Sequence, residues 1–156
     1  MTDFDIKVKG ASSITISGTN DNTMILPATA KIDSDRNQMD IDVENMETVK
    51  IGLPENSEKI ELACTDASVS IRDLCFTHFE IDGKGNLAIE ASNISGKLDI
   101  NLVGGEAVLA VPADFSFRLV NEGRNCKISS NVAEDPDSTN VVEFNGKDSS
   151  LSIRIL

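Results

Sequence analysis

Apolar and polar residues alternate along almost the whole chain. Met39, Ile41 and Val43, for example, are separated by Asp40 and Asp42. A period of two indicates a β-strand with one buried face, whereas no stretch of eleven residues shows the apolar stripe of a helix. The pattern therefore predicts an all-β protein. Similar alternation occurs at residues 14–16, 49–53, 69–71, 79–81, 87–89, 98–102, 115–119 and 151–155.

The spacing between these segments is regular. Ile71, Ile89, Leu109 and Ile128 follow one another at 18, 20 and 19 residues, and turn-forming residues fill the gaps. Two architectures fit this spacing. An antiparallel β-sandwich is favoured by Asp82-Gly83 and Asn145-Gly146, which are typical hairpin turns. A β-solenoid would instead place two strands in each coil of about 19 residues and bury each coil against its neighbours.

The segment "SGKLDINLVGGEAVLAVPADFSFRL" (95–119) combines a Ser-Gly turn, an alternating strand, a Gly break and a strand closed by Pro. It resembles the bacterial "putative adhesin" family of unknown function, relatives of auto-transporter adhesin head domains, and "NGKDSSLSIRIL" is similar to the closing strand of that family. The sequence departs from the family at "NEGRNCKIS" (121–129), where a second Ser-Gly turn is usual.

This resemblance implies a single-stranded, right-handed β-solenoid without established catalytic residues. We therefore predict one β-solenoid domain over residues 1–156, with the antiparallel β-sandwich as the alternative. The strand around "DFDIKVKG" is expected to cap one end of the solenoid.

The charge of the chain narrows the range of partners. Twenty-six acidic against fourteen basic residues give a formal net charge of −12, and no basic cluster is visible in the sequence. Phosphate backbones and anionic membranes repel such a surface, so we expect no nucleic-acid partner. The longest apolar run, "AVLAV" (107–111), is far shorter than the ~20 residues of a membrane span.

The cellular compartment is inferred from the cysteines and the first residues. Cys64, Cys75 and Cys126 have neither zinc nor thioredoxin spacing, so we expect buried free thiols in a reducing compartment. The opening residues lack the apolar core of a signal peptide, and a cytoplasmic location is the expectation.

The stretch "DSDRNQMDIDVE" (33–44) resembles a calcium loop. Gln38 stands where an EF-hand requires Gly, and in a strand Glu44 would lie about 23 Å from Asn37. We therefore predict a solvated turn at 33–38 followed by a strand that buries Met39, Ile41 and Val43. Weak cation binding remains an open alternative, through Asp33, Asp35 and Asn37 or through Asp40 and Asp42.

No residue is predicted to be catalytic, cofactor-binding or metal-binding. His78 is the single histidine; strand parity places it outward beside Glu80 and on the opposite face from Cys75. The chain has no Trp or Tyr to form a sugar-binding platform. The preferred function is a non-enzymatic structural or protein-interaction module with a protein partner or self-association. The alternative is a carbohydrate-active enzyme that uses surface carboxylates of a solenoid face.

Overall fold

The computed structural model describes residues 3–156, and within that range every regular element is a strand. The all-β prediction is confirmed. No helix suited to crossing a membrane occurs among these residues. The strands are β1 (Asp3–Lys9), β2 (Ser13–Thr19), β3 (Lys31–Asp35), β4 (Gln38–Glu44), β5 (Thr48–Pro54), β6 (Asn56–Val103), β7 (Glu106–Val111), β8 (Arg118–Asn121), β9 (Arg124–Ser130) and β10 (Val141–Ile155).

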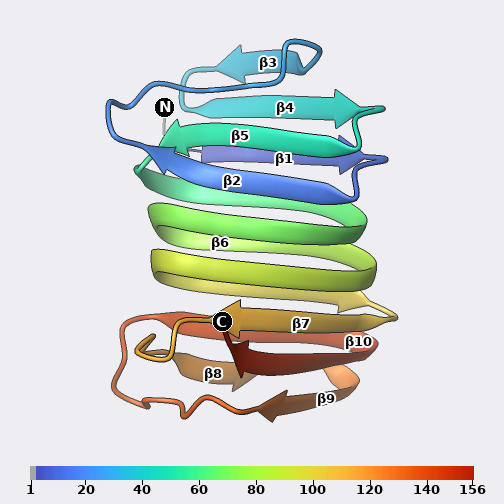
Figure 1. Ribbon diagram of the computed structural model, residues 1–156, viewed down its shortest axis with the longest axis vertical. Helices are drawn as coiled ribbons and strands as arrows, with labels where there is room; N and C mark the ends of the chain where they lie inside the picture. The colour runs from blue at the N-terminus through green and yellow to red at the C-terminus, as the bar shows by residue number, and fades with distance from the viewer. Residues whose placement is uncertain (1–2) are drawn as a thin grey trace.

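The strands form one mixed sheet in which parallel pairing dominates. Figure 1 shows β6 winding back and forth as stacked turns along the long axis of the molecule. We call one passage through both sides of this stack a rung. The stack has two sides, which we name after the first strand in each. The β1 face contains β4, β1, parts of β6, the first half of β10 and β8. The β2 face contains β5, β2, other parts of β6, β7, the second half of β10 and β9. Leu87 of β6 pairs with Ala107 of β7, twenty residues later.

Antiparallel pairing is confined, within residues 3–156, to β3 with β4 and to the bridge between Ile25 and Gly52. The hairpin turns that the β-sandwich alternative would place at Asp82-Gly83 and Asn145-Gly146 do not form, because both dipeptides lie inside long strands and Asn145-Gly146 pairs in parallel with β6. Gly146 is needed for packing instead: a Cβ there would meet the ring of Phe144.

The rungs at both ends of the stack do not follow chain order. β1 lies between β4 and β6, and β2 lies between β5 and β6. In the same way β10 lies between β6–β7 on one side and β8–β9 on the other. The prediction that the strand around "DFDIKVKG" caps one end is therefore wrong, because β4 and β5 lie outside it and β3 covers β4 (Figure 1).

The core lies between the two faces and consists of the inward positions of each strand. Ile41, Val43 and Ile100 are fully or almost fully buried, as the alternation predicts, and Phe144 of β10 is buried with them. Met39 is only half-buried. The strand predicted at 115–119 begins later, at Arg118; the two phenylalanines before it, 115 and 117, stack at 5.7 Å between ring centroids.

One corner of the stack, where each rung passes from the β1 face to the β2 face, repeats a single backbone feature. Every rung has a residue with positive φ at this corner. Glycine, asparagine and aspartate tolerate this conformation best, which explains the turn-forming residues at regular intervals. In order along the stack, the corner residues with positive φ are Asn45, Gly10, Asp66, Gly85, Gly104 with Gly105, Asp148 and Asn125.

Candidate functional site

The acidic stretch at 33–44 forms a hairpin rather than a calcium loop. Asp33 and Asp35 belong to β3 and only the next two residues make the turn, so the predicted turn at 33–38 is too long. Asp33 is the cross-strand partner of Asp40, and Gln38 Nε2 donates to Asp40 Oδ1 at 2.9 Å. No group of three or more His, Cys, Asp or Glu side chains in residues 3–156 is arranged to hold a metal ion.

His78 is half-buried rather than freely exposed. Its Nε2 lies 3.3 Å from Asp99 Oδ2 on the next rung. Cys75 is exposed, and Leu74, Phe76 and Phe79 are buried, so the alternation shifts by one residue between positions 76 and 79. The prediction from strand parity that Cys75 and His78 face opposite ways is therefore wrong, because parity holds only within a straight strand.

The three cysteines are free thiols, as predicted, but they differ in exposure. Cys64 is buried, Cys126 is half-buried and Cys75 is exposed. The prediction that all three are buried is therefore wrong for Cys75 and Cys126. Desolvation by burial raises the pKa of Cys64 to about 11, so this thiol stays protonated at neutral pH.

The structure assembles a feature that sequence inspection missed, a column of carboxylates along the β1 face. Strand register places Asp5 between Asp40 and Glu61, and Asp99 beside Glu143. Glu80 lies near Glu61 and Asp99, whose charges raise its pKa, and it accepts a hydrogen bond from Asn101 on the rung of Asp99. Adjacent strands are about 4.8 Å apart, so successive carboxylates are close neighbours. The acidic column comprises Asp40, Asp5, Glu61, Glu80, Asp99 and Glu143, all half-buried or buried.

Two lysines and one amide bind carboxylates of this column. Lys59 Nζ lies 2.7 Å from Glu61, and Lys97 Nζ lies 3.3 Å from Glu143. Asn101 Nδ2 donates to Glu80 Oε1 at 2.6 Å and to Asp82 Oδ1 at 2.9 Å. Cations and amide donors thus offset part of the repulsion that stacked like charges create.

The remaining repulsion, together with burial, changes how three of the carboxyls titrate. Desolvation is the largest cause of the raised pKa of Asp5, Glu80 and Asp99, and neighbouring carboxylates add to it. For Asp99 the neighbour is Glu143, and the hydrogen bond to His78 acts in the opposite direction. Asp99 is 7% exposed, and its Oδ1 has no hydrogen-bonding partner in residues 3–156. Asp99 is therefore the least favourably placed carboxylate of the column.

Replacing Asp99 with asparagine is expected to stabilise the protein at pH 7. The folded-state pKa of Asp99 is higher than its ordinary value of 3.8, so its stabilising contribution is present below 3.8 and is lost as the pH rises through the folded-state pKa. The asparagine side chain cannot ionise, it keeps a polar atom for His78, and its amide N–H can donate to the neighbouring Glu143. We expect the melting temperature of D99N to exceed that of the wild type by a few degrees at pH 7.

The control for this experiment is Glu90→Gln, which removes one charge from an exposed position of β6 that pairs with β7. Thermal melts from pH 3 to pH 8 should show the D99N advantage vanishing at the acidic end, while E90Q stays close to the wild type. An advantage that is independent of pH would contradict the role assigned to Asp99 ionisation.

The fold and the site define a class of protein, an all-β stack of mostly parallel strands whose polar groups lie on open faces. No protein-family model matches the chain, and no curated protein is similar to it. It is similar in structure to "a putative cell adhesion protein from Clostridium sporogenes ATCC 15579", with 16% sequence identity and a TM-score of 0.54. The match covers 99% of this chain and 92% of that chain. At this identity the likeness shows a shared fold.

Proposed function

We propose that the chain is a non-enzymatic, adhesin-like protein-interaction module built as a β-solenoid with coils of about 19 residues. The parallel pairing between successive turns of the chain supports the solenoid, as does the twenty-residue step between Leu87 and Ala107. The shared fold with a structure described as a putative cell adhesion protein supports the adhesin-like role. Three free thiols favour a reducing compartment, and we propose the cytoplasm.

The observation that carries the proposal is that the carboxyls with a raised pKa, Asp5, Glu80 and Asp99, lie on an open sheet face. Glu80 and Asp99 line none of the principal hollows on the described surface, and each has a partner, in Asn101 and His78 respectively. Catalytic carboxyls normally work inside a cleft that excludes water and orients a substrate. Carboxylates spread along a flat face are better suited to contact with another macromolecule.

The faces are better candidates for that contact than the strand edges. β3 at one end carries Lys31, Asp33 and Asp35, and all five of its residues are exposed. β9 at the other end carries Arg124 and Lys127, both exposed. Charged side chains on edge strands discourage pairing with a further strand. We therefore assign partner binding to a sheet face.

The alternative function, a carbohydrate-active enzyme, is favoured by one observation. Glu80 and Asp99 both have a raised pKa and lie on successive rungs about 4.8 Å apart, close to the separation of about 5–5.5 Å in retaining glycosidases. Such an enzyme would use one carboxyl as the acid and the other as the nucleophile.

A direct assay separates the two functions. The full chain is incubated with a panel of soluble polysaccharides and the release of reducing ends is measured, with Glu80→Gln and D99N as controls. In parallel, immobilised full chain is cross-linked to proteins from the cells that encode it. We expect no release of reducing ends and saturable binding of a specific protein. Release that is abolished by both substitutions would overturn the non-enzymatic proposal.

A further inference from the structure

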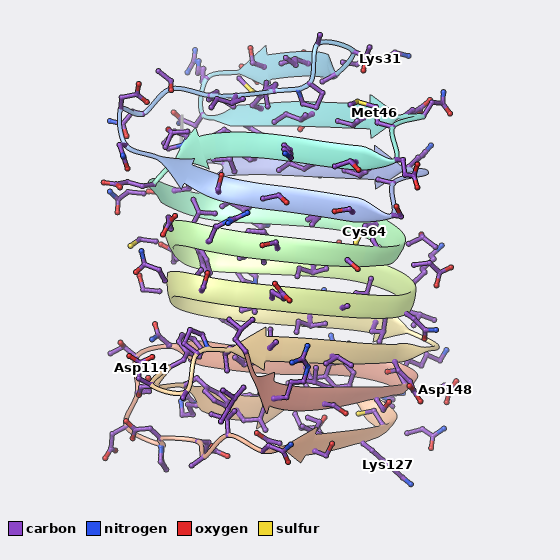
Figure 2. All side chains as sticks on the ribbon, viewed as in Figure 1. Lys31, Met46, Cys64, Asp114, Lys127 and Asp148 are labelled. Atoms are coloured by element: carbon purple, nitrogen blue, oxygen red, sulfur yellow. The ribbon has the colours of Figure 1, made fainter. Side chains whose placement is uncertain are left out.

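A shallow groove crosses the β1 face beside the acidic column. Its volume is about 540 Å³, and it spans five rungs from β1 through three turns of β6 to β10. Figure 2 places Cys64, which contributes to it, near the edge of the stack where the chain turns from the β1 face to the β2 face. The groove is lined by Lys7, Val8, Lys9, Ala63, Cys64, Thr65, Asp82, Gly83, Lys84, Asn101, Leu102, Val103, Asn145 and Lys147.

The groove gathers positive charge on a strongly acidic protein. Lys7, Lys9, Lys84 and Lys147 line it, against Asp82 alone among the acids, although acids outnumber bases by 26 to 14 in the chain. Sequence inspection finds no basic cluster because these lysines come from three strands and are brought together only by the stacking of rungs. Lys9 Nζ lies 3.9 Å from a carboxylate, that of Glu44, and the other three form no ion pair within residues 3–156. Their charge is therefore available to an anionic partner.

The groove also offers an apolar contact between the lysines. Val103 is 61% exposed and pairs in register with Lys147. Val8 and Leu102 are buried beneath the groove, and Cys64 beside them is a neutral thiol at neutral pH. The groove thus offers one exposed apolar side chain, Val103, beside the lysines.

The dimensions match a short extended peptide. Five rungs at about 4.8 Å cover roughly 19 Å, which is the length of about six residues at about 3.3 Å each. We propose that the groove binds an extended acidic segment of a partner protein, about six residues long, with carboxylates directed at Lys7, Lys84 and Lys147 and an apolar side chain on Val103. This inference rests on the proposed function as a protein-interaction module.

Two other occupants fit the surface less well. A continuous polyanion would run beside the acidic column, whose Glu61 and Glu80 lie two residues, or about 6.6 Å, before the groove residues Ala63 and Asp82. A peptide avoids that repulsion because its charges can alternate with apolar or basic residues. A second copy could offer its acidic loop at 133–140, but Asp135 Oδ2 already accepts from Ser116 Oγ at 3.0 Å, and Glu134 Oε1 accepts from Leu119 N at 3.3 Å.

The test uses a fluorescein-labelled peptide of sequence ELELELE as the probe, with KLKLKLK as its charge-reversed counterpart, and measures anisotropy with the full chain. We expect ELELELE to bind and the double variant Lys84→Glu with Lys147→Glu to weaken its binding at least tenfold. The control is Lys50→Glu with Lys127→Glu, which makes the same charge change at exposed positions of β5 and β9 on the β2 face. This control should bind ELELELE as the wild type does. Added salt should weaken the binding of ELELELE to the wild type.

Three results would overturn the inference. One is negligible binding of ELELELE to the wild type, or equal affinity of ELELELE for the two double variants when both melt like the wild type. Another is tighter binding of dextran sulfate than of ELELELE at the groove, and the third is a dimer in light scattering that the groove variant dissociates. Failure here is distinct from failure of the proposed function: a cross-linked partner that the groove variant still binds would refute only the groove, whereas polysaccharide turnover would refute the non-enzymatic role itself.

Discussion

Replacing Phe144 with Ala is expected to destabilise the protein by about 3–5 kcal/mol, which corresponds to a fall of about 10 °C in melting temperature. Phe144 is fully buried although it belongs to the last strand of the chain. It pairs in register with Ile100 on one side and with Asn121 on the other. The truncation therefore opens a cavity inside the stack, where the surrounding rungs cannot collapse around it.

The matched comparison is Phe115→Ala. Phe115 is only half-buried and precedes β8, so the same loss of a phenyl ring should cost much less. Phe4 offers the converse check: it is 1% exposed and lies between Met39 and Ile60, in the first strand of the chain. Phe4→Ala should therefore behave like F144A. Chemical denaturation of the three variants measures the difference, and equal small effects for all would show that the terminal strands are not held inside the stack.

Phe4 and Phe144, which lie in the first and last strands but inside the stack, show which part of the fold cannot be predicted from sequence. Alternation correctly places Ile41, Val43 and Ile100 inside, because parity is a local property of each strand. The order of rungs depends instead on pairing between distant segments, such as Asp3 with Lys59. Since most of the strands carry a similar apolar stripe, each of these could pair with almost any other. Chain order is then the simplest assumption, and it fails at both ends of the stack.

The candidate surfaces were hidden for the same reason. The acidic column brings Asp99 beside Glu143, 44 positions along the chain, and the groove brings Lys7 near Lys84 and Lys147. Each carboxylate or lysine alone has the appearance of an ordinary solvated residue on the polar side of a strand. If the order of rungs is assumed wrongly, the predicted neighbours of every outward side chain are wrong as well. A surface formed by several rungs therefore could not be predicted from spacing. Gly85, Gly104 and Gly105, by contrast, meet a local backbone requirement, and they lie among the turn-forming residues that the sequence places between strands.

Replacing Gly105 with Ala is expected to cost several kcal/mol, more than most single substitutions outside the core. Gly105 has φ of +79°, in the left-handed region that alanine enters at a cost of about 1–2 kcal/mol. A Cβ at this position would also collide with the backbone carbonyl oxygen of Gly85 on the preceding rung, closer than real Cβ atoms approach. The collision is with backbone rather than with a flexible side chain, so relief requires the two rungs to separate. Parallel pairing of Leu87 with Ala107 begins two residues beyond this corner and would be disturbed by that separation.

Gly104 supplies a control within the same turn. Its φ is +65°, so Gly104→Ala enters the same left-handed region, but no atom lies within 4 Å of the added Cβ. G104A should therefore lose about 1–2 kcal/mol, the conformational cost alone, and Gly104→Asn should lose less because asparagine tolerates this region. The difference between G105A and G104A in free energy of unfolding, measured by chemical denaturation, isolates the cost of the contact between rungs. Equal losses in the two variants would mean that the spacing between rungs at this corner yields easily, and that the glycine serves the turn conformation rather than the close stacking of one rung on the next.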